Sequence, residues 1–420
     1  MVKMKKFISS FAITILLVGC TKEEVVKTVF QDVPGDTVTV TVPGPTVTVV
    51  DTVTVNFPPP EYSFTRNGKS TVFYTGQTTR LGQADALKSA MNDVSSTEAG
   101  ILDMFDNGEG FSDATLNGTG KKVGNKTGAK SPNTAVNKAK FDGWIKEFVD
   151  NVIPAVNAST DGAAGVAGLV SDASGSRTNL KANAKGLEMN QIFSKGLIGA
   201  FNLDQIIGEG GYLSNSKLDP VKEDNDAGVY GYAGTDDNAA GELNVTKMEH
   251  FWDEGFGYLY GQDSQFTPET GKGSLLNYYL KKVEGVIPGI SKTIYDAFIL
   301  GRAAIVTKNY TLRDEQAKIV KVELSKVVGD RAEYYLSSAA DKLAAGEMAS
   351  YLHALSEGYG LIFSLQYTQD ADGNPYMSYD EVNAMLAELE AGNGFWDRTE
   401  AELDTMAAKV KAATGLLNIN

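Results

Sequence analysis

The sequence has very few of the side chains that most often bind transition metals or form covalent links. Its 420 residues include one cysteine, Cys20, and two histidines, His250 and His353. A single cysteine excludes a disulfide within the chain, so the folded part depends on its hydrophobic core. The HExxH motif of zinc peptidases and the GxSxG motif of serine hydrolases are both absent. The common metallopeptidase and nucleophile patterns are therefore excluded.

Basic residues are also scarce relative to acidic ones. The chain carries 38 Lys and Arg against 53 Asp and Glu, a formal net charge of −15. An acidic chain repels phosphate backbones, because binding to nucleic acid depends mainly on neutralising phosphates. We therefore expect no nucleic-acid partner.

The N-terminus has the pattern of a lipoprotein signal peptide. Three lysines precede an apolar run, residues 7–18, that is too short to span a membrane. The run ends in Leu17-Val18-Gly19-Cys20, which resembles a lipobox and predicts cleavage after residue 19 and lipidation of Cys20. The following Thr21-Lys22-Glu23-Glu24 resembles the export signal of surface lipoproteins. These features predict a lipid anchor in the outer membrane, with the protein exposed at the surface.

Residues 20–60 differ in composition from the remainder of the chain. Near copies of one pentapeptide occupy residues 36–40, 45–49 and 51–55, and three prolines follow at 58–60. Alternating Thr and Val broken by Pro and Gly favour an extended chain without an apolar face for a core. We interpret this segment as a stalk. The alternative is an edge strand folded onto the body.

Residues 61–420 have the composition of a globular domain with a dominant helical period. Apolar residues recur three and four positions apart in ten segments, with Gly, Asn, Asp and Pro clusters between them. The segments are residues 81–105, 135–156, 180–207, 245–260, 275–283, 290–306, 314–343, 348–365, 379–389 and 400–416. The pattern predicts an all-α helical bundle with antiparallel neighbours.

Both histidines begin the same sequence pattern, HxxxEG[FY]G. One copy is HFWDEGFG from His250 and the other is HALSEGYG from His353. On a helix, residues i and i+4 share a face, so His250 lies beside Glu254 and His353 beside Glu357, with Asp253 adjacent to the first pair. The repetition predicts an internal duplication, with two pseudo-repeats in the body.

Two interpretations of the repeated pattern remain open. In the first, His250, Asp253, Glu254, His353 and Glu357 meet and bind a polar ligand or a divalent metal, iron or zinc, as facing helices do in bundle metal sites. In the second, each histidine pairs with its own carboxylate and joins helices in the core. The glycines after each pair indicate that another chain segment passes close to both helices.

Four further residues are candidates for lining a pocket with the histidines. Glu188, Gln191 and Lys195 lie at helical spacing of three and four. Arg302 lies in an apolar segment, where a buried guanidinium requires a carboxylate partner, for which we expect Glu254 or Glu357. Such a pair would favour the structural interpretation. A solvated helix face is the alternative for the first three residues.

A weak calcium-loop candidate lies between the last predicted helices. Asp370, Asp372, Asn374 and Glu381 occupy oxygen-donor positions of an EF-hand-like frame, but Pro375 stands where the frame requires glycine. An interhelical turn is the alternative, in which Ser378 caps the next helix and Glu381 completes a capping box.

Several separated segments together resemble one known family. They are residues 62–81 (YSFTRNGKSTVFYTGQTTRL), 186–200, 248–258, 299–305, 353–358 and 394–397. In this order they resemble a Bacteroidetes lipoprotein family, domain of unknown function 4856, which is similar to the imelysin group of iron-regulated surface proteins. Both copies depart from the GxHxxE motif of imelysins. Met248 and Tyr351 stand where the motif has glycine, and Asp253 and Ser356 stand where it has glutamate.

The resemblance implies a role in iron or other nutrient acquisition, beside an outer-membrane receptor or transporter. We therefore expect a surface lipoprotein that binds a ligand or metal without catalysis. A metal-dependent hydrolase of imelysin type and a structural accessory subunit of an uptake complex are the alternatives.

Overall fold

The computed structural model describes residues 58–66, 68–231 and 245–415. Residues 58–420 form one compact unit by their internal contacts. The predicted signal peptide, Cys20 and residues 20–57 of the stalk lie outside the described residues.

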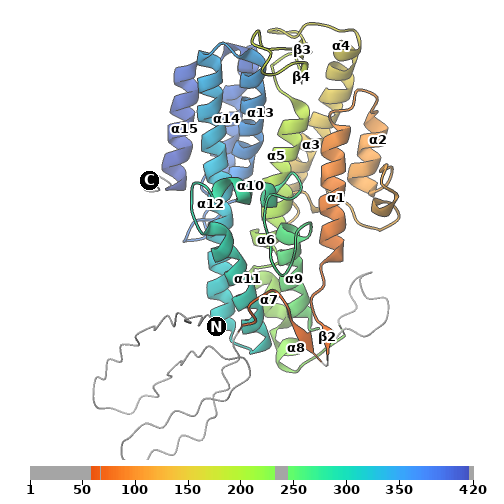
Figure 1. The fold of residues 1–420 in the computed structure, drawn as a ribbon, viewed down its shortest axis with the longest axis vertical. Coiled ribbons are helices and arrows are strands. Elements are labelled where there is room, and N and C mark those ends of the chain that lie inside the picture. The colour runs from red at the N-terminus through yellow and green to blue at the C-terminus, as the bar shows by residue number, and fades with distance from the viewer. Residues whose placement is uncertain (1–57, 67, 232–244, 416–420) are drawn as a thin grey trace, which may run out of the picture. The chain divides into compact units, whose positions relative to one another are not determined.

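Ten helices of eight or more residues form the framework of the described part (Figure 1). They are α1 (Thr75–Ala90), α3 (Thr134–Glu147), α5 (Met189–Leu197), α9 (Lys247–Tyr260), α10 (Leu276–Val283), α11 (Ile290–Val306), α12 (Tyr310–Ala344), α13 (Met348–Ser364), α14 (Tyr379–Leu389) and α15 (Glu400–Thr414). The predicted all-α class is confirmed. The predicted bounds are met at both ends for α11 and α14 and nearly so for α13.

Shorter elements connect these helices. The short helices are α2 (Glu98–Leu102), α4 (Ile153–Asn157), α6 (Asp204–Ile207), α7 (Asn215–Leu218) and α8 (Lys222–Asp226), and π-helical turns lie at Asp103–Asn107, Phe148–Val152 and Ile198–Leu203. Two small antiparallel sheets pair β1 (Thr65–Arg66) with β2 (Lys69–Ser70), and β3 (Gly168–Val170) with β4 (Leu180–Ala182).

Two of the predicted helices are interrupted, for local reasons. The segment 81–105 breaks after α1, where Asp93 Oδ1 accepts hydrogen bonds from the backbone and hydroxyl of Ser95 and stabilises a turn. The segment 180–207 begins as strand β4. A turn containing Gly186, whose φ of +83° favours glycine, then precedes α5.

The long helix α12 organises one side of the bundle. It packs against α11, α13 and α15, and α13 in turn packs against α5. On the other side, α1 contacts both α5 and α9. At 1.5 Å per residue, the 35 residues of α12 span roughly 50 Å. In Figure 1, α13 lies in the upper half of the bundle and α9 in the lower half.

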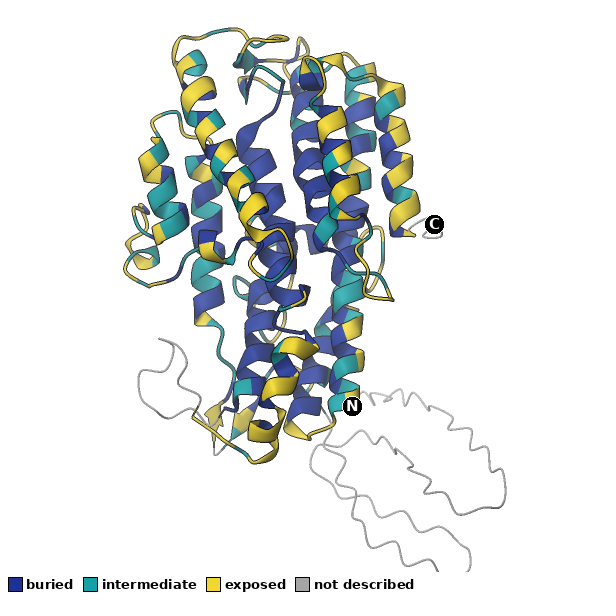
Figure 2. Ribbon diagram, turned by 180° about the vertical axis from the view of Figure 1, so that it is seen from behind, coloured by how far each residue is buried: buried dark blue, intermediate teal, exposed yellow. Residues whose placement is uncertain are grey.

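The central helices are buried on every face (Figure 2). All residues of α5 are buried, as are all residues of α9 except Lys247. Polar side chains on these two helices therefore need partners within the protein, because an unpaired buried polar group is costly. Within the described ranges, no helix combines the length and apolar character needed to cross a membrane.

Candidate functional site

The first histidine lies on α9, whose start is determined by a capping box. Thr246 accepts a hydrogen bond from the backbone N–H of Glu249, and the Glu249 carboxylate accepts one from the backbone N–H of Thr246. His250, Asp253 and Glu254 of this helix are all buried, and His250 is only 2 % exposed. The helix therefore presents several ionisable groups to a water-poor interior.

A buried network of charges surrounds Asp253. Arg302 Nε donates to Asp253 Oδ1 at 2.9 Å, and Arg302 Nη1 lies 3.0 Å from Glu249 Oε1. Arg66 donates to both oxygens of Glu249, at 2.8 and 3.0 Å. Tyr62 donates its hydroxyl proton to Asp253 Oδ1 at 2.7 Å. The segment at the N-terminal end of the described body is thus joined to α9 by an ion pair and a hydrogen bond, and the same two carboxylates pair with Arg302 of α11.

The pKa values of this network reflect burial and pairing. Burial raises the pKa of Asp253 to about 6, although Arg302 and the Tyr62 hydroxyl favour its charged form. Burial would also raise the pKa of Glu249, but Arg302, Arg66 and the backbone of Thr246 lower it to about 2. At neutral pH both carboxylates are ionised and are neutralised by the two arginines.

Arg302 has a different partner from the one predicted. The expectation of Glu254 or Glu357 was wrong, because Asp253 and Glu249 take that position. Glu249 and Asp253 lie four residues apart on α9, so they share the helix face that contacts Arg302 of α11. Arg302 is entirely buried and belongs to this network.

Glu254 forms a separate group with His250. Its Oε1 accepts hydrogen bonds from Gln77 Nε2 at 2.8 Å and from the Tyr212 hydroxyl at 3.1 Å. His250 Nε2 lies 3.7 Å from Glu254 Oε2. The predicted i, i+4 neighbourhood of the histidine and the glutamate is confirmed.

The second histidine lies on α13 between two carboxylates. His353 Nδ1 is 2.6 Å from Glu188 Oε2, and Nε2 is 3.5 Å from Glu357 Oε2. When Glu188 is ionised, the short contact requires a proton on Nδ1. The His353 side chain is 19 % exposed, so this cluster reaches the surface, whereas the His250 side chain is 3 % exposed.

The three predicted pocket residues near α5 belong to the same cluster of contacts as His353. Glu188 precedes α5 as its N-terminal cap residue, in an extended conformation. Lys195 Nζ lies 3.1 Å from Glu357 Oε1 and donates to Gln191 Oε1 at 3.1 Å. Burial alone would raise the pKa of Glu357, but the charges of Lys195 and His353 hold it below its ordinary value.

The five residues of the first interpretation therefore divide into two groups. His250, Asp253 and Glu254 contact residues of α1, α11 and the segment after α6, whereas His353 and Glu357 contact residues of α5 and α10. The groups are chemically parallel. Each glutamate accepts a tyrosine hydroxyl at 3.1 Å, from Tyr212 in one group and Tyr279 in the other. The predicted internal duplication stays a prediction.

Neither group, as arranged, suits a divalent metal. Glu188 lies at Nδ1 of His353 and Glu357 lies at Nε2, so a metal bound to either nitrogen could not be bound by both carboxylates. In addition, Lys195 pairs with Glu357. Asp253 is engaged by Arg302. Among the residues that the structure describes, no group of three His, Cys, Asp or Glu side chains is arranged to hold a metal ion.

The glycines after the histidines contact different neighbours. A Cβ at Gly257 would lie 2.4 Å from Tyr74 Cβ, and one at Gly360 would lie 2.5 Å from Lys195 Cβ and 2.8 Å from the Ile192 carbonyl oxygen. A Cβ at Gly358 would meet only ordinary contacts. Gly360 thus permits the close approach of α13 to α5 that brings Lys195 to Glu357.

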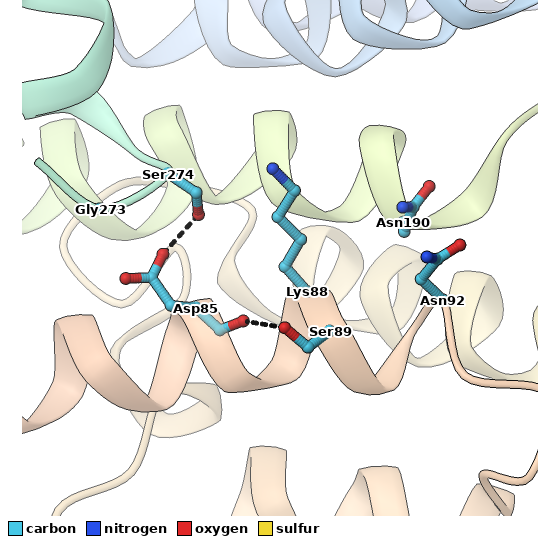
Figure 3. Close-up of a pocket in the computed structure, with 7 residues that line it drawn as sticks. All are labelled: Asp85, Lys88, Ser89, Asn92, Asn190, Gly273 and Ser274. Carbon is cyan, nitrogen blue, oxygen red and sulfur yellow. Dashed lines mark hydrogen bonds between the residues drawn. The ribbon is translucent and has the colours of Figure 1, made fainter. Parts of the chain in front are cut away.

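A surface cavity of about 430 Å³ lies between α1, the start of α5 and the loop before α10 (Figure 3). Its lining residues are all polar or glycine: Asp85, Lys88, Ser89, Asn92, Asn190, Gly273 and Ser274. Ser274 donates to Asp85, which also accepts from Gln262. In Figure 3, Lys88 extends from α1 between the Asp85–Ser274 pair and the two asparagines.

Two groups of the cavity wall have unused hydrogen-bonding capacity. Asn190 is 7 % exposed, and its Oδ1 has no hydrogen-bond partner in the described part of the chain. Lys88 forms no ion pair there either. Burial and the charge of Lys195 lower the pKa of Lys88, while Glu357, Asp85 and Glu188 oppose this shift. The cavity wall includes Asn190, which lies two residues after Glu188 of the His353 cluster.

The sequence analysis did not identify Lys88, Asn190, Tyr62 or Arg66 as site residues. Asn190 lies between Glu188 and Gln191, which were identified, so its position in a polar stretch of a buried helix was an available signal. No sequence pattern indicated Lys88, because it contacts α5 only through the packing of α1 against that helix.

The calcium-loop frame forms a turn. Asp370 Oδ1 accepts hydrogen bonds from the backbone N–H groups of Asp372 and Asn374. Glu381 accepts from the backbone and hydroxyl of Ser378 in a capping box that starts α14. The predicted cap is confirmed, and it occupies the carboxylate that would be the last calcium ligand.

Comparison with known proteins identifies a family for nearly the whole body. The model of the family described as Domain of unknown function (DUF4856) matches residues 59–417. No curated protein and no solved structure matches the chain. The predicted resemblance to this family is confirmed, and the further similarity to imelysins stays a prediction.

Proposed function

The chain belongs to the DUF4856 family, and we propose that it is a lipid-anchored surface protein that binds a small polar solute for nutrient acquisition, without catalysis. The lipid anchor rests on Cys20 at the end of the apolar N-terminal run. The binding role rests on the cavity beside the His353 cluster. The solute class follows from the groups that line this cavity.

The observation that carries the proposal is the unpartnered amide oxygen of Asn190. A buried acceptor without a partner costs about 1–3 kcal/mol, so it favours a bound donor. The Asn190 residue lines an open surface depression of about 430 Å³, and small-molecule sites are concave. Such sites are usually mostly apolar, and this one is not, which favours a hydrophilic ligand.

The ligand must offer both an acceptor and a donor. Lys88 supplies a cation that favours a carboxylate or another anionic oxygen, whereas Asn190 Oδ1 requires a hydroxyl or amine donor. Small hydroxy acids, sugar acids and amino acids meet both requirements. Hydroxycarboxylates also chelate iron, and this would connect the cavity to iron acquisition.

Binding is tested with a panel of hydroxycarboxylates, sugar acids and amino acids, measured by calorimetry on the purified protein. We expect a member of the panel to bind, and Lys88→Met and Asn190→Ala each to weaken it about tenfold or more. Lys409→Met, which removes an exposed lysine of α15, is the matched control and should bind normally. Retained affinity in both cavity variants would refute the proposal.

Metal content distinguishes the alternative of a metal-dependent hydrolase. Stoichiometric iron or zinc that is lost in a His250→Ala, His353→Ala double variant of intact fold would favour that alternative over the solute-binding role. Normal solute binding by the same double variant would place the ligand in the cavity and separate it from the histidines.

A further inference from the structure

The wall of the surface cavity contains two opposite charges that do not pair with each other. Asp85 and Lys88 lie three residues apart on α1, and both line the cavity. Side chains at this spacing are neighbours on a helix and often form an ion pair. In the described part of the chain, neither residue forms one. The two charges do act on each other, because burial lowers the pKa of Lys88 and Asp85 opposes that shift.

Asp85 is engaged instead by neutral groups of the loop between α9 and α10. Its Oδ1 accepts a hydrogen bond from the hydroxyl of Ser274, and its Oδ2 accepts one from Gln262 Nε2 at 2.7 Å. Neither donor carries a charge, so the negative charge of the carboxylate is not neutralised. In Figure 3 the Asp85–Ser274 pair lies at one end of the cavity, and Lys88 extends toward α5. The cavity therefore presents a negative and a positive group at separate places.

A glycine of the cavity wall permits this arrangement. Gly273 has a φ of +63°, which favours glycine. A Cβ there would overlap Gln262 Oε1 and would lie 3.2 Å from Asp85 Oδ2. A side chain at this position would thus displace Gln262 from Asp85. The loop is built to pass close to the carboxylate and to hold it in the wall.

The opposite end of the cavity supplies an acceptor. Asn190 Oδ1 is buried and has no hydrogen-bond partner within the described ranges. The neighbouring Asn92 Oδ1 is already engaged, since it accepts from Lys181 Nζ at 2.9 Å. A carboxylate oxygen can accept more than one hydrogen bond, so Asp85 keeps capacity for a further donor. The cavity thus offers a cation for an anionic group, and an anion with an amide oxygen for donors.

We infer that the cavity selects a zwitterion, an α-amino acid or a short peptide, whose carboxylate pairs with Lys88 and whose ammonium group donates to Asp85. The inference rests on the proposed function and narrows its ligand class. Asn190 Oδ1 accepts a further N–H or O–H of the ligand. Hydroxy acids and sugar acids bring no cation to Asp85, and its charge repels their carboxylate. Asp85 is therefore the residue that determines specificity, because it favours one class and disfavours the other.

The test compares ligands that differ only at the ammonium group, by calorimetry on the purified protein. The pairs are L-alanine with L-lactate, L-phenylalanine with L-phenyllactate, and alanyl-alanine with its N-acetyl derivative. We expect the zwitterion of at least one pair to bind about tenfold or more tightly than its partner. This preference is measured first on the wild type, so it does not depend on the folding of any variant.

Variants then assign the preference to one charge. Asp85→Asn should reduce the preference to about threefold or less, whereas Ser274→Ala, which removes a hydrogen bond but keeps the charge, should retain it even if both affinities fall. Lys409→Met on α15 is the control and should leave affinity and preference unchanged. Melting temperatures establish that each variant is folded.

The outcomes separate this inference from the proposed function. If a hydroxy acid or a sugar acid binds through Lys88 and Asn190 at least as tightly as every zwitterion, the proposed function stands and the zwitterion class is wrong. If no ligand of either panel binds, both are wrong. A full preference in folded Asp85→Asn would overturn the role of Asp85.

Discussion

Arg302 and Asp253 form an ion pair that is wholly buried. The Arg302 Nε donates to Asp253 Oδ1 at 2.9 Å, and neither side chain has exposed surface. The pair joins α9 to α11, and Tyr62 and Thr71 add hydrogen bonds to it from the N-terminal segment. The stability of the bundle should therefore depend strongly on each partner.

The first prediction concerns the removal of this arginine. Arg302→Met should lower the free energy of unfolding by about 3–5 kcal/mol, because it leaves the buried charges of Asp253 and Glu249 without their shared partner. The double variant Arg302→Met, Asp253→Asn should recover part of this loss. Chemical denaturation of the three proteins provides the measurement. A loss below about 1 kcal/mol in the single variant would contradict the network.

The second prediction concerns the pH dependence of stability through Glu249. Its pKa is about 2 in the folded protein, below the ordinary 4.5, so the unfolded state binds more protons between these values. The stabilisation, on the order of 3 kcal/mol, is complete above pH 4.5 and is lost as the pH falls toward 2. Glu249→Gln should remove this dependence.

The comparison requires denaturation of the wild type and of Glu249→Gln at several pH values. The difference in unfolding free energy should be largest near neutral pH and should shrink as the pH falls from 4.5 toward 2. A difference that stays constant over that range would show that Glu249 acts through packing rather than charge.

The third prediction uses two glycines of one helix. Gly360→Ala should destabilise the protein by about 1–3 kcal/mol, because the added methyl group would meet the Lys195 Cβ and the Ile192 carbonyl oxygen. Gly358→Ala should be neutral or stabilising by up to about 1 kcal/mol, because the helix gains propensity and the methyl group finds ordinary contacts. Melting temperatures provide the measurement, and Gly360→Ala should melt at a lower temperature than Gly358→Ala. If Gly358→Ala melts at the lower temperature, the prediction is wrong.

The fourth prediction separates the helix cap from a calcium site. Ser378→Ala should cost about 1 kcal/mol, because α14 loses the side-chain acceptor at its first turn. Calcium at millimolar concentration should leave the melting temperature unchanged, since Glu381 is bound to Ser378. A calcium-dependent rise that disappears in Asp370→Asn would instead support the loop as a metal site.

Some features follow from the sequence because their causes are local. The helical class came from apolar spacing, and the cap at Ser378 from its distance to Glu381, which involves one turn of chain. The need of Arg302 for a carboxylate also followed from its apolar segment. The identity of that carboxylate did not, because residue spacing defines a helix face but not the element that packs against it.

The sequence by itself determined most of the long helices, the cap at Ser378 and the i, i+4 pairs of each histidine, since these depend on hydrogen bonds and spacings within about four residues. Only the tertiary structure decided that the two histidine groups are separate, that Arg302 meets Asp253 49 residues away and Thr71 231 residues away, and that Lys88 and Asn190 share a cavity. The physical reason is that such contacts depend on the rotation and register of whole helices, which are set by the packing of the entire core.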